Sequence, residues 1–372
     1  KNWSRIGLKN LEESVNLLIM NDGSFSQHST NYHRLVLDTL SQVELWRRWL
    51  GLKPFSNNFY TKFKAATNWL NQFIDDKSGN VPNLGHNDGS FCYQLHCLSY
   101  RDFRPTLKVA QLLYPPKNGS SLSQNEYYES PIWLNLTDSK IEKIKNKNLE
   151  IFDSGGYVII RPNNNQWGML RLPTYNFRPA HADPLHFDLW SNGENILRDA
   201  GTFSYNSNPT DVNYFKGVEG HNTVQFDKKN PMIPLGNFLW GNWLKLETLE
   251  KFPNKKDSFS IAASYRFFSG KHHRSIEVSS CGKFWKIIDS VSFFRNECLI
   301  RWRLPPLNWE IDRFDIRSSL ANLKVGSNKN IDKISLSSGY ESLFYNQKES
   351  IPVLEILIKS SPVKVTLVVE LF

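Results

Sequence analysis

The stretch Val363-Lys364-Val365-Thr366-Leu367-Val368-Val369 alternates apolar and polar side chains over most of its length. A period of two places successive side chains on opposite faces of a β-strand. Related runs occur at 157–160, 186–190 and 223–226, and turn residues separate such runs at short intervals. The part of the chain from 151 to 372 is therefore predicted to form a large antiparallel β-sandwich.

The first part of the chain has a helical period instead. Apolar side chains recur three or four residues apart at about 6–18, 29–50, 59–74, 90–100 and 106–114. Amphipathic helices that follow one another through short turns are typical of an α/α array.

The change of period predicts the domain organisation. Residues 1–115 are predicted to form an incomplete N-terminal α/α toroid of helical hairpins, 116–150 a connector, and 151–372 the β-sandwich. Helices followed by strands indicate an α+β fold. Because the chain opens on Lys1 and is helical in pattern from its start, we expect a fragment of a longer protein.

The composition is that of a folded protein and narrows the choice of partners. The 372 residues are 40% hydrophobic and 22% charged, which excludes a disordered tail or a coiled coil. No apolar run approaches the roughly 20 residues that cross a bilayer, so no membrane span is expected. The net charge of +9 favours an acidic partner. No run of five or more basic residues occurs, which argues against nucleic acid.

Two histidines and an aspartate lie in three motif-like strings of the β part, and they are His181, Asp199 and His221. On neighbouring strands they would provide a nitrogen, oxygen, nitrogen ligand set that leaves the fourth position of a zinc ion open. A paired His and Asp without metal is also common in sheet proteins. The spacing alone therefore leaves the metal open.

A second polar cluster, 22–34, begins a predicted helix. Ser29 is a plausible N-cap, which places Tyr32 and His33 in the first turn. The partial positive charge of a helix N-terminus, with Arg34 if it points the same way, favours an ionised tyrosine. Such a tyrosine can act as a proton-transfer group. The alternative is that Tyr32 is a core residue with its hydroxyl at the rim.

A third cluster, 83–90, contains His86 and Asn87 in a loop. Asn and Gly residues in this loop are typical of a turn or a helix cap. Clustered amides and a histidine at the rim of a toroid are equally suited to bind sugar hydroxyls or a carboxylate.

These clusters, in this order, resemble the heparinase II/III family of polysaccharide lyases and their alginate-lyase relatives. The resemblance covers nearly the whole chain, and the Asp199-Ala200-Gly201-Thr202 and His221-Asn222-Thr223 strings are its most specific part. It implies β-elimination on a uronic acid of an acidic polysaccharide. It also implies that Tyr32 and His33 are catalytic, and that a structural Zn²⁺ lies at His181, Asp199 and His221.

Several further residues are expected to contact the glycan, namely Gln27, His86, Asn87, Arg178, Tyr205 and Tyr214. Two departures matter. The Asn-His pair that relatives carry well before the tyrosine would lie ahead of Lys1. In addition, Pro179 stands where relatives with the metal site carry the first histidine of a His-x-His string. That loss favours the alternative of a non-catalytic or biosynthesis-linked relative that binds an acidic glycan. A bacterial periplasmic or cell-envelope location is expected, with the cytoplasm open, and the oligomeric state is not indicated.

Overall fold

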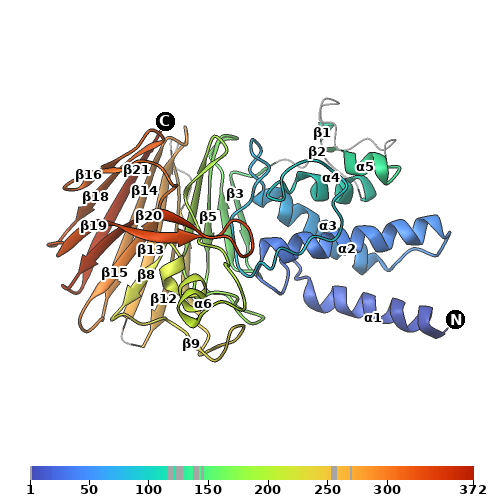
Figure 1. Cartoon of the computed structure of the whole chain (residues 1–372), viewed down its shortest axis with the longest axis horizontal. Coiled ribbons are helices and arrows are strands. Elements are labelled where there is room, and N and C mark those ends of the chain that lie inside the picture. The colour runs from blue at the N-terminus through green and yellow to red at the C-terminus, as the bar shows by residue number, and fades with distance from the viewer. Residues whose placement is uncertain are drawn as a thin grey trace.

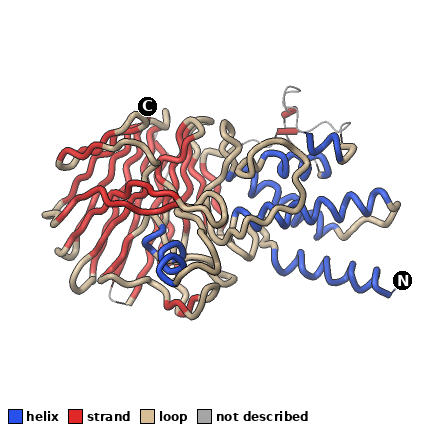
Figure 2. The backbone as a smooth tube through the Cα atoms, viewed as in Figure 1, coloured by secondary structure: helices blue, strands red, loops and turns tan. Residues whose placement is uncertain are grey.

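The computed structural model describes residues 2–114, 120–121, 129–136, 142–143, 146–252, 258–268 and 270–372. Most helices gather at one end of the molecule and the larger sheets at the other, which confirms the α+β prediction (Figures 1 and 2). Within the described ranges, none of the helices combines the length and the apolar character that crossing a bilayer requires.

Four of the five predicted helices are present. The helices of the described residues are α1 (Asn2–Leu18), α2 (Thr30–Trp49), α3 (Asn57–Phe73), α4 (Arg104–Leu113), α5 (Glu129–Trp133) and α6 (Pro209–Lys216), with the 3-10 turn η1 (Val218–Gly220). Ser29 caps α2 as predicted, since its hydroxyl accepts a hydrogen bond from the Tyr32 amide at 3.1 Å. These helices show only part of the predicted toroid.

The prediction of a helix at 90–100 is wrong, because this segment consists of bends and irregular chain. Short polar side chains bind its backbone and so compete with helical hydrogen bonds. Asn87 accepts from the Gly89 amide at 2.8 Å, and Asp88 accepts from the Ser90 amide at 2.9 Å. These hydrogen bonds keep the start of the segment out of a helical conformation despite its apolar period.

The strands form antiparallel sheets, as predicted. The larger sheets of the described chain have the orders β3-β4-β5-β6-β7, β19-β20-β15-β8 and β11-β12-β13-β14-β21-β18-β17-β16. Their bounds are β3 (Leu149–Phe152), β4 (Tyr157–Ile160), β5 (Gln166–Arg171), β6 (Phe187–Ser191), β7 (Glu194–Leu197), β8 (Val224–Phe226), β11 (Leu246–Lys251), β12 (Ser258–Phe267), β13 (Gly270–Ser279), β14 (Phe284–Ser292), β15 (Cys298–Arg303), β16 (Glu310–Asp312), β17 (Asp315–Arg317), β18 (Ala321–Ser327), β19 (Lys333–Glu341), β20 (Glu349–Ile358) and β21 (Val363–Leu371). Two short pairs, β1 (Ser120–Ser121) with β2 (Glu142–Lys143) and β9 (Ile233–Pro234) with β10 (Trp240–Gly241), complete the described strands.

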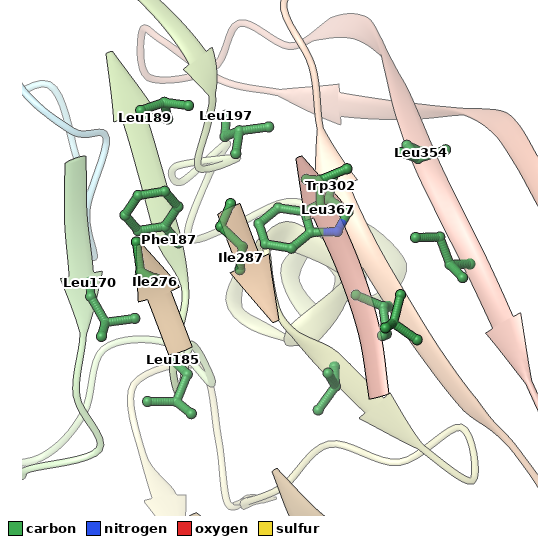
Figure 3. Packing of buried hydrophobic residues seen from close by; sticks show 14 of the residues in the cluster. Leu170, Leu185, Phe187, Leu189, Leu197, Ile276, Ile287, Trp302, Leu354 and Leu367 are labelled. Atoms are coloured by element: carbon green, nitrogen blue, oxygen red, sulfur yellow. The ribbon is translucent and has the colours of Figure 1, made fainter. Parts of the chain in front are cut away.

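The five-stranded sheet is a wall shared by two hydrophobic cores. Val158 and Phe187 point into the sandwich core, whereas Ile159 and Trp167 belong to the core shared with the helices. Figure 3 shows the sandwich side, where side chains of β5 and β6 meet those of β13, β14 and β21. Because alternate side chains of one strand face opposite sides, this single sheet holds the helices and the sandwich together.

Polar contacts also join the helical part to the sandwich. The Thr202 hydroxyl donates to the Gly85 carbonyl at 2.9 Å, and the Asn83 side-chain amide donates to the Ser342 carbonyl at 2.8 Å. Gly201 lies in this contact with a φ of +73°, and a Cβ there would come within 2.0 Å of the Asn83 amide nitrogen. Only glycine suits such a conformation and such a close approach.

Candidate functional site

A cleft of about 560 Å³ lies where α2 meets loops of the sandwich. Its walls come from the turn before α2, from α2 itself, from the 83–90 loop and from three loops of the β part. The lining residues are Phe25, Gln27, Tyr32, Leu35, Val36, Thr39, His86, Arg178, Tyr205 and Phe238. The structure therefore brings together five of the residues predicted from the sequence.

The Tyr32 hydroxyl lies between two polar groups in this cleft. It is 2.9 Å from the Asp88 carboxylate and 2.9 Å from the Tyr205 hydroxyl. A carboxylate only accepts, so the Tyr32 hydroxyl donates a hydrogen bond to Asp88. Tyr205 must then donate to Tyr32, and the two hydrogen bonds run in one direction from Tyr205 through Tyr32 to Asp88.

Asp88 is held as an ionised acceptor. The Ser90 amide and hydroxyl both donate to its other oxygen. Burial opposes ionisation of Asp88, but the hydrogen bonds from Ser90 and Tyr32 outweigh it, so the pKa of Asp88 lies below its usual value.

Tyr32 is neutral, which corrects the prediction of an ionised tyrosine. Its pKa is raised to about 12, with burial as the largest cause; the hydrogen bond from Tyr205 lowers it and Asp88 raises it further. Arg34 is engaged elsewhere, because its guanidinium lies 4.2 Å from the centre of the Tyr100 ring and donates to Asn31. Burial and the Asp88 carboxylate together outweigh the partial positive charge at the N-terminus of α2 and raise the pKa of Tyr32.

Tyr205 is fixed by aromatic neighbours. The centres of the Phe238 and His86 rings are 4.8 Å and 5.7 Å from that of Tyr205, and the Tyr345 hydroxyl accepts from the Tyr205 amide at 3.1 Å. Burial, and then the hydrogen bond with Tyr32, raise the pKa of Tyr205. Both tyrosines are therefore neutral phenols in the cleft.

Three of the predicted catalytic and glycan-binding residues lie outside the cleft lining. His33 is buried in the helical core, where Nε2 is 2.8 Å from the Ala66 carbonyl oxygen and the ring stacks on Trp69. Asn87 supports the loop through its bonds to Gly89 and Tyr100. The Tyr214 hydroxyl accepts from Arg303 at 2.8 Å and from the Tyr340 amide at 2.9 Å.

The structure thus places His33 in the helical core and engages the Tyr214 hydroxyl with Arg303 and Tyr340. A pattern of residue types marks them as candidates, but the direction of each side chain depends on packing between elements.

His181, Asp199 and His221 come together at the sandwich side of the cleft. Their ligand atoms all lie within 4.8 Å of one another, and all three residues are buried. The His221 Nδ1 is 2.9 Å from an Asp199 oxygen. The His181 ring makes an edge contact with His86, with ring centres 5.5 Å apart, so the cluster adjoins the cleft.

The cluster fits a metal ion in its donor set and in its unmet hydrogen-bonding capacity. Buried nitrogens seldom lack a partner, yet His181 Nδ1 and His221 Nε2 have no hydrogen-bond partner within the described residues. Burial lowers the pKa of His181 well below its usual value, which keeps the ring neutral. Neutral imidazoles and a carboxylate are ligands that Zn²⁺ prefers.

Residues around the cluster hold its side chains in place through hydrogen bonds, as residues around a metal site commonly do. His186 bridges Asp188, at 2.9 Å, and Asp199, at 3.6 Å. The Asn222 amide donates to His186 Nδ1 at 2.9 Å, and its side chain binds the Phe187 carbonyl. These contacts give a physical reason for Asn222, the residue that follows His221 in its string.

Sequence reasoning missed Asp88, Tyr345 and Phe238. Asp88 reads as a turn residue between Asn87 and Gly89, and it does form that turn. Its contact with Tyr32 joins positions 56 residues apart, and no local pattern signals it.

The sequence model of the heparinase II/III-like C-terminal family matches residues 144–340. The heparin-sulfate lyase of Bacteroides thetaiotaomicron is 22% identical over 262 residues, which cover 64% of this chain and 35% of that protein. The solved heparan sulfate lyase HepC of Pedobacter heparinus has a TM-score of 0.75 and 18% identity, over 99% of this chain and 56% of that one. A solved heparinase III has a TM-score of 0.77 and 16% identity, over 100% of this chain and 55% of that one.

These comparisons agree with the fold and the motifs described above. At such identities the solved structures establish a shared fold, and the chain spans just over half of their length. The family match covers more than half of this chain, from β3 through β19. The protein therefore belongs to the heparinase II/III-like family.

Proposed function

We propose that this protein is a lyase that cleaves a uronic-acid-containing polysaccharide by β-elimination. The observation that carries the proposal is the neutral Tyr32 hydroxyl in the cleft, held between Asp88 and Tyr205. The names of the relatives, heparin-sulfate lyase and heparan sulfate lyase, support the same class of reaction.

β-Elimination requires a neutralised uronate carboxylate, a base and an acid. Neutralising the uronate carboxylate acidifies the C5 proton, a base removes that proton, and an acid protonates the departing O4 of the glycosidic bond. The electrons of the C5–H bond form the new double bond as the C4–O4 bond breaks. No water is consumed, and one chain end becomes a 4,5-unsaturated sugar.

Tyr32 is the residue that we assign to protonation of O4. As a phenol it carries a proton that a leaving oxygen can take. The Tyr205 hydroxyl already points its proton at the Tyr32 oxygen, so it would stabilise the phenolate that forms. Asp88 keeps Tyr32 protonated between turnovers, because an adjacent negative charge disfavours the phenolate.

Arg178 is the residue that we assign to the uronate carboxylate. It lines the same cleft as Tyr32 and is exposed to solvent, and one of its nitrogens donates to the Phe238 carbonyl at 3.1 Å. A guanidinium can form two parallel hydrogen bonds with a carboxylate.

We further propose that His181, Asp199 and His221 hold a structural Zn²⁺. The ion would join the loop before β6, the segment after β7 and the residue after η1. Thr202, whose hydroxyl is 3.2 Å from His181 Nε2 and which donates to Gly85, continues that link to the helical part. The ion would thus stabilise the wall of the cleft and take no part in proton transfer.

Detection of the unsaturated product tests the proposed reaction. The protein, in the length in which it is naturally made, is incubated with uronic-acid polysaccharides, and the ultraviolet absorbance of the unsaturated uronate is followed. We expect a steady rise with at least one glycan and a product mass equal to the substrate fragments without added water. Products that have gained water would instead identify a hydrolase.

One observation favours a second candidate, a glycan-binding protein without turnover. Pro179 is buried beside Arg178 and supplies no proton-transfer group where the family resemblance expects a histidine. Calorimetric binding of a polyuronate, together with no unsaturated product over a long incubation, would favour this candidate over the lyase.

A further inference from the structure

We infer that a second groove, at the β11 edge of the eight-stranded sheet, binds an acidic sugar of the polymer that enters the cleft. The inference rests on the proposed function, because it gives the proposed substrate a second contact. The groove, of about 440 Å³, lies between the start of β11 and the end of β12, and none of its described lining residues also lines the cleft. Its described lining includes Asn242, Trp243, Lys245, Glu247, Arg266 and Phe268.

Aromatic side chains give the groove exposed flat faces. Trp243 is 39% exposed and Phe268 is 74% exposed. Large apolar groups gathered at one exposed place mark a binding surface. The Trp243 ring is held in position, because its indole nitrogen donates to the Trp240 carbonyl at 2.6 Å. Fixed aromatic faces of this kind pack well against the C–H faces of sugar rings.

Cations beside these rings match the carboxylates of a polyuronate. The Arg266 side chain is 53% exposed, and its guanidinium carbon lies 5.4 Å from the centre of the exposed Phe293 ring. Lys245 is exposed in the same groove. A guanidinium can form two parallel hydrogen bonds with a carboxylate. An acidic sugar would therefore find a charge partner and an apolar face side by side.

A β-bulge organises the charges of the groove. The register of β11 with β12 shifts between Leu246 and Thr248, which leaves Glu247 as the extra residue. A bulge of this kind redirects a side chain, and bulges are frequent beside functional sites. The Glu247 carboxylate lies 2.7 Å from the Lys271 ammonium group and 3.6 Å from the Arg266 guanidinium. One carboxylate thus orients two cations without neutralising both, so the groove keeps an excess of positive charge.

The groove and the cleft are built on one segment of the chain. Trp243 is bound to Trp240, whose indole nitrogen donates to the Ala180 carbonyl at 3.1 Å, two residues after Arg178. Phe238, which lines the cleft, precedes Trp243 by five residues, so their Cα atoms are at most about 18 Å apart. A long glycan in the cleft can therefore reach the groove, and a second contact on one polymer raises the overall affinity.

Removal of one cation from the groove, with a matched control, tests the inference. Arg266→Gln removes the groove guanidinium, and Lys324→Gln removes a cation from β18 that is 72% exposed and 4.0 Å from Asp315. Calorimetry measures the binding of long-chain alginate, hyaluronan and heparosan to the protein in its natural length. We expect Arg266→Gln to raise the dissociation constant of the bound polymer about fivefold, and Lys324→Gln to leave it nearly unchanged. Equal weakening in both variants, or binding of none of the three polymers by the wild type, would overturn the inference.

The aromatic face is tested by Trp243→Ala, with Trp243→Phe as its control. We expect weaker polymer binding in Trp243→Ala and near wild-type binding in Trp243→Phe, which keeps a flat ring. Melting temperatures check that both variants fold. Unchanged binding in Trp243→Ala would contradict the inference. Self-association of the wild type that Trp243→Ala abolishes would assign the groove to a second copy of the chain, and would also overturn it.

Initial rates separate the groove from the cleft, because product forms from substrate bound in the cleft. Arg266→Gln should raise KM several-fold for a long polymer and leave kcat unchanged, since the groove contributes affinity alone. An equal loss of kcat with a polymer and with a tetrasaccharide would place the effect in the cleft and overturn the inference. If no polymer yields an unsaturated product, the lyase function fails, and the dissociation constants alone decide the inference.

Discussion

The hydroxyl of Tyr32 has one proton, and its neighbours decide where that proton points. Asp88 can only accept, so the proton faces Asp88 and the oxygen receives the hydrogen bond of Tyr205. This arrangement suits a group that must stay protonated until the leaving O4 replaces Asp88 as the acceptor. Asp88 is thus a positioning residue, and its influence can be measured apart from that of Tyr32.

Replacing Asp88 by Asn should move the alkaline limb of the pH–rate profile. The pKa of Tyr32 is about 12, chiefly through burial, and Asp88 contributes to that rise. An acid loses activity as the pH rises through its pKa, so loss of the carboxylate should shift the fall in kcat to lower pH. Asn preserves the size of the side chain, and circular dichroism checks the fold.

Ser90→Ala is the matched control for this experiment. Its hydroxyl donates to the other oxygen of Asp88, so the substitution loosens the loop while leaving the carboxylate in place. A shift in Asp88→Asn that Ser90→Ala does not reproduce would assign the effect to the charge. Identical profiles for wild type and Asp88→Asn would contradict the positioning role.

At the scale of elements, the N-terminus of α2 sets the position of Tyr32. Ser29 accepts from the Tyr32 amide and donates to the His86 carbonyl at 2.5 Å, so one hydroxyl joins the helix to the 83–90 loop. Substitution of an N-cap serine by alanine costs about 1 kcal/mol of stability. In Ser29→Ala we expect that loss together with a fall in kcat, measured by thermal unfolding and by initial rates.

Ser56→Ala provides the comparison, because Ser56 caps α3 and accepts from the Phe59 amide at 3.1 Å. It should lower the melting temperature by a similar amount and leave kcat unchanged. An equal fall of kcat in both variants would mean that Ser29 acts through stability alone.

The same elements show how far local patterns reach. The helical period predicts α2 and α3 within a few residues, and the period of two predicts β21, because burial of one face dictates both patterns. The apolar run at β4 is also predicted as a strand, and it is apolar throughout because both of its faces are buried. The period fails at 90–100, where Asn87 and Asp88 bind the backbone ahead of any helix. Hydrogen bonds from a side chain to the nearby backbone are hard to recognise in a sequence, yet they determine the conformation of this loop.

The residue identities of the candidate site were more predictable than their arrangement. Tyr32, Arg178 and Tyr205 line one cleft as expected. His33 turns into the core instead, because adjacent residues of a helix face different sides. Asp88 was missed, since its role exists only after two segments far apart in the chain have met.

On the scale of the whole molecule, the five-stranded sheet and the contacts around Gly85, Asn83 and Thr202 position the cleft. The helices supply Tyr32, and the sandwich supplies Tyr205 and Arg178. Neither part has a complete site by itself, so the proposed activity depends on the junction.

The proposed Zn²⁺ belongs to that junction and predicts a change in stability. We expect about one equivalent of zinc by elemental analysis, consistent with one set of three ligands. We also expect a lower melting temperature after chelation, because an ion that binds the folded state stabilises it. His181→Gln should lose the zinc and reproduce the lower melting temperature.

His272→Gln is the control for this prediction. His272 is also buried and 2.7 Å from an aspartate, Asp289, but it lies within β13 in the sandwich core. Its substitution should destabilise the protein without releasing zinc. Well-folded wild-type protein with less than about a tenth of an equivalent of zinc would contradict the metal site.

The central claim is that Tyr32 transfers a proton in an elimination, and Tyr32→Phe tests it most directly. The substitution removes one oxygen atom from a half-buried side chain and leaves the ring in place. The account predicts a fall of about 10²–10⁴-fold in the rate of unsaturated product, with unchanged glycan affinity and nearly unchanged melting temperature. A Tyr32→Phe variant that forms the unsaturated product at the wild-type rate would contradict it.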